Sequence, residues 1–173
     1  MGVLLGDKGR FAVEVGEWTD SLRRVDLWVA DHWLTCDDNA AYVEQFRPAV
    51  RDTALQVRSG HGWPLPFAGL SPAATHRRFV AATGNDTEDE LLRERFWIFD
   101  GWGPTTDNLL AYLFRDGDQL VITVQFWRDE HLRNHPEHAG TVFAVEIEAA
   151  EFAGILEDLV IVLDPGKRPP AIK

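Results

Sequence analysis

The sequence predicts a single α+β domain over residues 1–173, with a mostly antiparallel sheet and two main packing helices. Three observations favour this class. Several short apolar runs alternate with polar residues at the period of two that marks strands. An Asp-Gly pair at residues 116–117 separates two such runs, which is a strong hairpin signal. Two longer runs repeat apolar residues at the three-and-four spacing of a buried helix face.

The N-terminal part of the chain predicts two strands. Residues 11–17, FAVEVGE, alternate apolar and polar side chains. Residues 22–30 alternate in the same way after a turn, so we expect the two strands to pair antiparallel. The run WLT at 33–35 is expected to extend the second strand after a kink at residues 31–32.

The first helix is predicted next, with Asp38 or Asn39 as its N-cap. Its expected buried stripe consists of Val43, Phe46, Val50, Ala54 and Val57. Pro48 conflicts with an unbroken helix because it cannot donate to the carbonyl four residues earlier. We therefore expect either a kink at Pro48 or a helix that begins near Glu44.

The middle of the chain carries stronger signals for the interruption of helices and strands. Residues 59–72 contain three glycines and three prolines, so we expect a loop lying over the edge of the core. Residues 77–83 predict a short strand. Thr87 and Glu90 then match a capping box at the start of an acidic helical turn.

The remaining residues predict the rest of the sheet and the second main helix. We expect strands at 95–100, 109–115, 119–127 and 141–148. The third of these is apolar on both faces, which is typical of a central strand. The final helix stops at the Asp-Pro-Gly of residues 164–166. Its expected stripe consists of Phe152, Ile155, Leu156, Leu159 and Leu163.

Composition excludes some classes of function. The formal net charge is −11, with 28 acidic residues against 17 Lys plus Arg. This balance disfavours nucleic acid and anionic membranes as partners, because their phosphates would be repelled. We expect no membrane helix, since no apolar run approaches the ~20 residues required. The single Cys36, with no visible signal peptide, favours the cytoplasm. The excess acid indicates either solubility or a basic protein partner.

The stretch FWIFDGWGPTTDN, residues 96–108, is the most unusual loop. It lacks the lysine and the third glycine that phosphate-binding loops require, and no serine stands between its glycines. Its glycines and proline indicate tight turns that present Trp102. This tryptophan is either a core side chain or an anchor for a partner.

Two groups of residues are weak candidates for chemistry. His131, His135 and His138 have the residue type that zinc prefers, but Pro136 opposes a continuous helix through them. A polar loop between two strands is the simpler interpretation. Cys36 as a nucleophile would need a lowered pKa, which its acidic neighbours oppose, although His32 is close enough in sequence to act as a base.

The opening GDKGRFAVEVGEW, followed by LRRVDLWVADHWLT, resembles a bacterial immunity-protein family of polymorphic-toxin systems. In that family a "GD…FA(I/V)E" strand leads into a second strand that bears a tryptophan. The resemblance covers about the first fifth of the chain. It implies a small cytoplasmic α+β protein that neutralises a cognate toxin by binding, without catalysis.

Three functions are consistent with these features. We favour a non-catalytic protein that binds another protein, such as a basic toxin domain, and that needs no cofactor and no metal. Its expected contacts are Trp63, Asp86, Glu88, Asp89, Glu90, Trp102 and Asp107. The alternatives are a metal-dependent enzyme of unknown class that uses the His131–His138 loop, and a self-associating structural or regulatory domain that forms homo-oligomers. Whether the chain is an enzyme stays open at this point.

Overall fold

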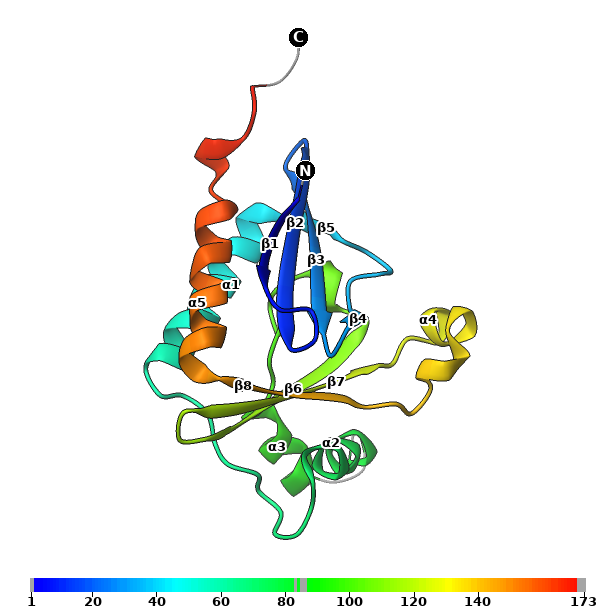
Figure 1. The fold of residues 1–173 in the computed structure, drawn as a ribbon. Coiled ribbons are helices and arrows are strands. Elements are labelled where there is room, and N and C mark those ends of the chain that lie inside the picture. The colour runs from blue at the N-terminus through cyan, green and yellow to red at the C-terminus, as the bar shows by residue number, and fades with distance from the viewer. Residues whose placement is uncertain (1, 83, 85–86, 171–173) are drawn as a thin grey trace.

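The N-terminal strands form one antiparallel sheet, sheet A, in the order β1-β2-β3-β4, and β5 also pairs with β3 (Figure 1). The structure is a computed structural model, in which residues 2–82, 84 and 87–170 are described. The strands of sheet A are β1 Val3–Gly6, β2 Phe11–Thr19, β3 Leu22–Val29, β4 His32–Trp33 and β5 Ala40–Tyr42. The antiparallel pairing of β2 with β3 confirms the prediction for the first two strands.

The prediction that residues 33–35 extend the second strand is wrong. The chain reverses at Ala30 and Asp31, whose φ angles are 50° and 65°. Strand β4 then returns antiparallel, so that Trp33 lies opposite Trp28. The reversal was missed because two consecutive left-handed residues that are not glycine carry no turn signal.

Helix α1, Val43–Arg58, confirms the first predicted helix, and its whole predicted stripe is buried. Its N-cap is Tyr42 and not Asp38 or Asn39, because β5 forms immediately before the helix. Asn39 instead donates to a carboxylate oxygen of Asp26 at 2.8 Å. Pro48 lies inside α1, shortly after its first turn, which agrees with the predicted late start.

A second antiparallel sheet, sheet B, has the order β6-β7-β8. Its strands are β6 Leu109–Asp116, β7 Gln119–Phe126 and β8 Phe143–Glu148. The β6–β7 hairpin turns at Gly117, with φ 59°, as the Asp-Gly pair predicts. β7 lies between its two neighbours, which confirms the predicted central strand.

Helix α5, Ala149–Val162, packs along α1, and the two helices cover sheet A on one side (Figure 1). All five residues of the predicted α5 stripe are buried. Arg58 of α1 also forms a two-pronged ion pair with Glu157 of α5, both bonds being 2.8 Å long. The inner faces of both sheets and both helices belong to one core, so the α+β class with two main packing helices is confirmed.

The opposite face of sheet B is covered by helix α2, Pro72–Ala81, with helix α3, Thr87–Glu94, beside it (Figure 1). A second, smaller core of Phe79, Phe96, Tyr112 and Phe114 lies there. The predicted strand at 77–83 is wrong up to residue 82, and residue 83 lies outside the described residues. Ser71 accepts a bond from the Ala74 N–H, so the Ser-Pro pair starts a helix and does not end the loop.

Two further segments complete the fold. The predicted strand at 95–100 is wrong, because only Trp97 makes an isolated bridge, to Tyr112. Helix α4, Asp129–Asn134, follows β7 and ends before Pro136, in agreement with the expected break. Among the helices of the described ranges, none combines the length and the apolar character needed to cross a bilayer.

Candidate functional site

The segment 96–102 lies along the edge of sheet B and directs some of its side chains into the core and others to the surface. Phe96, Ile98, Phe99 and Trp102 are buried, whereas Trp97 is 42% exposed. Backbone bonds fix the segment to β6, since the Leu113 N–H donates to the Phe96 carbonyl at 2.7 Å. The segment is therefore held rigidly, with Trp97 pointing outward.

The direction of this segment depends on a strained residue. Phe99 has φ 67°, a left-handed conformation that bulky residues rarely adopt. Its ring packs against Trp102 at 4.7 Å between centroids, inside the core. Strain of this kind is maintained only when the surrounding packing demands it, and it is concentrated at functional sites.

The prediction that Trp102 contacts a partner is wrong, because this side chain lies in the core. Its side chain is 1% exposed, and its indole N–H donates to Oγ1 of Thr53 on α1 at 3.0 Å. It also meets the ring of Phe46 edge to face at 5.4 Å. Of the two interpretations of Trp102, the core side chain is the one that fits.

Two hollows, of about 650 and 510 Å³, share residues 97–101 as a common wall. Trp97 borders both. The larger hollow is mostly apolar, and its other lining side chains include Val80, Leu110 and Trp127. The smaller is more polar and is lined also by Asp52, Thr53, Gln56, His61, Trp63, Glu94 and Arg95.

Three exposed tryptophans border these hollows, and each is held in place without being buried. Trp63 is 38%, Trp97 42% and Trp127 48% exposed. The indole N–H of Trp127 donates to the Asp107 carbonyl at 2.9 Å. Trp63 packs edge to face on His61 at 4.8 Å. Exposed aromatic side chains with restricted motion are typical of protein-binding surfaces.

Carboxylates outnumber guanidinium groups around the hollows. The acidic lining residues are Asp52, Glu94, Asp100 and Asp107, and the basic ones are Arg93 and Arg95. Arg93 is in addition 3.5 Å from a carboxylate oxygen of Glu90. This surface therefore carries the same sign of charge as the whole chain.

The structure brings only some of the predicted contact residues together. Trp63 and Asp107 line the hollows. The three acidic residues in the first turn of α3 do not line the hollows: Glu88, Asp89 and Glu90. At the other end of α3, Arg93 and Glu94 do line them. Asp89 pairs with Arg78 at 2.9 Å. Asp86 and the Thr87 side chain of the capping box lie outside the described residues.

Sequence reasoning missed Trp97 and Trp127. Both were assigned to strands, where alternation alone does not say which face is covered. The signal that marks Trp97 is its position between buried Phe96 and Ile98, which forces the intervening side chain outward.

The predicted histidine loop forms a different arrangement from a three-histidine metal site. Nε2 of His131 is 2.8 Å from Nδ1 of His138, and Nδ1 of His131 is 2.7 Å from Oδ2 of Asp37. His131 is 1% exposed and stacks on Phe126 at 3.9 Å between centroids. Its two ring nitrogens are thus both engaged by side chains, so the three histidines do not converge on one point.

Cys36 lies beside this histidine pair. Its Sγ is 3.8 Å from Nδ1 of His131, so the nearby imidazole is His131 and not the predicted His32. Burial and the charge of Asp37 raise the pKa of the Cys36 thiol to about 11. Burial and neighbouring His131 lower the pKa of His138. The thiol is therefore protonated at neutral pH, which opposes a role as a nucleophile.

The architecture defines a class of α+β proteins with two antiparallel sheets, one of which is covered by two packed helices. A solved structure of this class is CdiI from Burkholderia dolosa AUO158, a contact-dependent inhibition immunity protein. The TM-score is 0.59 at 11% identity, over 92% of this chain and 99% of that chain. At this identity the likeness shows a shared fold, and it agrees with the resemblance found in the first strands. No protein-family model matches the chain, and no curated protein matches it.

Proposed function

We propose that this protein neutralises a cognate toxin by binding it in the cytoplasm, without catalysing a reaction. The observation that carries this proposal is the fold shared with an immunity protein over 92% of this chain and 99% of the other. The N-terminal resemblance supports the same class from sequence. The binding surface we propose is the pair of hollows on either side of Trp97, together with Trp63 and Trp127.

The shape of this surface supports a protein as the partner. Two adjoining hollows separated by a ridge at Trp97 suit two neighbouring side chains or segments of a macromolecule. Trp127 and Trp63 are already held, by a hydrogen bond and by a ring contact respectively. They therefore lose little conformational entropy on binding, which favours affinity.

The charge of the surface supports a basic partner. Four carboxylates and two guanidinium groups line the hollows, and the chain as a whole carries −11. A field of this sign accelerates the approach of a positively charged domain and repels nucleic acid. A basic toxin domain fits both conditions.

The binding test uses isothermal titration calorimetry with the toxin domain that we expect to be encoded beside this gene, expressed in a catalytically inactive form. We expect a 1:1 complex. The substitution Trp97→Ala removes a central anchor and is expected to weaken binding by about 30-fold, equivalent to ~2 kcal/mol. Trp33→Ala is the matched control, since Trp33 is 40% exposed but lies on sheet A. Equal losses in both variants, or no complex with the wild type, would contradict the proposal.

The charge test measures association rates at several salt concentrations. Asp100→Asn removes a carboxylate from the shared wall of the hollows and is expected to slow association, most strongly at low salt. Asp158→Asn makes the same charge change on the exposed side of α5 and is expected to have a smaller effect. If the association rate falls equally in both variants, the effect comes from the net charge of the protein and not from this surface. Sedimentation of the free protein tests the self-associating alternative.

A further inference from the structure

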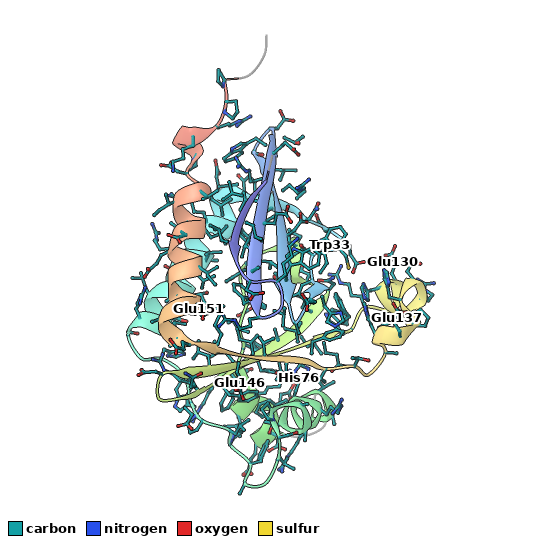
Figure 2. All side chains as sticks on the ribbon, in the orientation of Figure 1. Trp33, His76, Glu130, Glu137, Glu146 and Glu151 are labelled. Atoms are coloured by element: carbon teal, nitrogen blue, oxygen red, sulfur yellow. The ribbon has the colours of Figure 1, made fainter. Side chains whose placement is uncertain are left out.

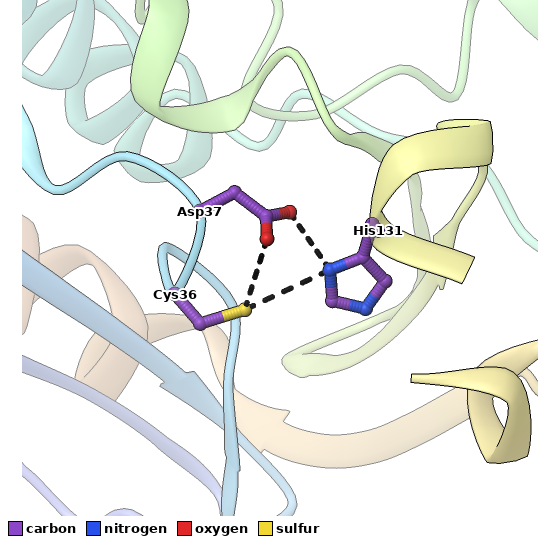
Figure 3. Close-up of side chains that lie close together, drawn as sticks. All are labelled: Cys36, Asp37 and His131. Carbon is purple, nitrogen blue, oxygen red and sulfur yellow. Dashed lines mark hydrogen bonds and ion pairs between the residues drawn. The ribbon is translucent and has the colours of Figure 1, made fainter. Parts of the chain in front are cut away.

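Three ligand atoms of different side chains converge between the β4–β5 loop and α4 (Figure 3). Sγ of Cys36 lies 3.8 Å from Nδ1 of His131 and 3.9 Å from Oδ1 of Asp37. A thiol, an imidazole and a carboxylate are the three side-chain types that zinc binds in proteins. The surface proposed for the partner does not include these residues.

The two separations from the Cys36 sulfur are close to those around a tetrahedral ion. Ion–ligand distances near 2.3 Å for sulfur and near 2.0–2.2 Å for nitrogen and oxygen place neighbouring ligands ~3.5 Å apart. Cys36 Sγ is within a few tenths of an ångström of this distance from each of the other two atoms. The 2.7 Å contact between His131 and Asp37 joins Nδ1 to the other carboxylate oxygen, Oδ2, so Oδ1 is left for an ion. On binding, Nδ1 exchanges this hydrogen bond for the ion.

The residues around Cys36, Asp37 and His131 hold these side chains as the outer partners of a metal site do. Nδ2 of Asn108 donates to Oδ2 of Asp37 at 2.8 Å and also to the Leu34 carbonyl at 3.2 Å. Nε2 of His131 faces Nδ1 of His138 at 2.8 Å. With an ion on Nδ1, the proton of His131 resides on Nε2 and is donated to His138. Metal-binding histidines almost always have such a partner, which fixes the ring and the tautomer.

The position of His131 also favours a built site over a surface coincidence. Its ring is 1% exposed and stacked on Phe126, so its orientation is determined by the core. Asp37 is 38% exposed, which leaves a path for an ion and a place for a water ligand. A second group, His135, Glu137 and His138, is more exposed and contains no thiol.

We propose that Cys36, Asp37 and His131 bind one thiophilic divalent transition-metal ion of the zinc class, with a fourth position open to water or to a ligand from outside. Binding displaces the Cys36 thiol proton into solvent, moves the His131 proton from Nδ1 to Nε2, and involves no change of oxidation state. The ion joins the β4–β5 loop to α4, which are separated by more than 90 residues in the chain. Such a link stabilises the folded protein. Hard ions such as Mg²⁺ are excluded by the thiolate.

The test titrates chelator-treated full-length protein with Co²⁺ and records absorption spectra. We expect 1:1 binding, with a sulfur-to-cobalt charge-transfer band in the near ultraviolet and intense visible bands of a four-coordinate ion. Cys36→Ser is expected to abolish the charge-transfer band and to weaken binding at least ~10-fold. His135→Ala is the matched control and is expected to leave both unchanged.

Thermal melting gives a readout that does not require spectra. Zn²⁺ is expected to raise the melting temperature of the wild type and of His135→Ala, but not that of Cys36→Ser, and Mg²⁺ is expected to have no effect. Circular dichroism checks that Cys36→Ser is folded. Wild-type protein that binds neither Co²⁺ nor Zn²⁺ overturns the proposal, as does binding that survives Cys36→Ser and is lost in His135→Ala. Toxin binding does not enter either measurement, so the two proposals fail separately.

Discussion

The indole N–H of Trp102 donates to Oγ1 of Thr53 at 3.0 Å, which joins the segment 96–108 to helix α1 across 49 residues of sequence. Trp102 is 1% exposed, and Thr53 is the acceptor that the fold provides for its N–H. The loop that resembles an exposed recognition loop in sequence is thus anchored through its second tryptophan, while the first, Trp97, faces solvent.

Substitution of Thr53 tests the stability that this bond provides. Thr53→Val removes the acceptor while keeping the shape, and it leaves a buried N–H unpaired. We expect a loss of about 1–3 kcal/mol in the free energy of unfolding, measured by urea denaturation. Thr53→Ser retains the hydroxyl and is expected to lose less. A Val variant as stable as the wild type, with the Ser variant less stable, would show that the methyl group, and not the bond, matters.

Quenching of tryptophan fluorescence by acrylamide tests the assignment of exposed and buried indoles. Trp33, Trp63, Trp97 and Trp127 are expected to form the accessible fraction, because each is more than a third exposed. Trp97→Phe should reduce that fraction, whereas Trp102→Phe should remove emission from the protected fraction. Quenching of the Trp102 component as strong as that of Trp97 would contradict the fold of the segment.

Stability should decrease as pH falls from about 6.5 toward 4, partly because of His76. This side chain lies between β7 and α2, where Nδ1 is 2.8 Å from Oγ1 of Thr123 (Figure 2). Burial lowers the pKa of His76 from 6.5 to about 4. The unfolded chain therefore binds a proton in this window that the folded protein does not bind. The full window corresponds to a loss on the order of 3 kcal/mol.

A comparison of variants isolates this contribution from those of the carboxylates. His76→Gln removes the titration, so its unfolding free energy, measured by denaturation at each pH, should fall less steeply between pH 6.5 and 4 than that of the wild type. Parallel curves for the two proteins would show that His76 is not the group responsible.

The β6–β7 hairpin depends on the left-handed conformation of Gly117, with φ 59°. An added Cβ would meet no neighbouring atom within 4 Å, so any cost of substitution comes from the backbone alone. We expect Gly117→Ala to lose about 1 kcal/mol in thermal or urea unfolding, and Gly117→Asn to lose less, because Asn tolerates this conformation. An Asn variant as unstable as the Ala variant would argue against this account.

Sequence periodicity predicted the elements whose burial is regular along the chain. The stripe of α1 and the alternation of β2 are examples, because in both the spacing of apolar residues alone indicates one buried face. The strand predicted at 77–83 shows where this approach fails. The short apolar run there fits the period of a strand as well as that of a helix. The residue that shows a helix is the N-cap Ser71, and the sequence interpretation had assigned Ser71 to the preceding loop.

The candidate site was predicted only in part. Trp63 and Asp107 were identified because exposed turns carry their own composition signals. Trp97 was not, because its exposure depends on how the segment packs on sheet B. The grouping of Cys36 and Asp37 with His131 was also missed, since no local pattern indicates a contact across more than 90 residues.

By itself the sequence determined the α+β class, the β6–β7 hairpin, the two main helices and the acidic balance, because each depends on neighbouring residues or on composition. Only the tertiary structure decided that Trp102 points inward and Trp97 outward, and that a loop after β4 meets α4. These relations result from packing between distant segments, where the free energy of burying an entire core selects which side chain each turn presents.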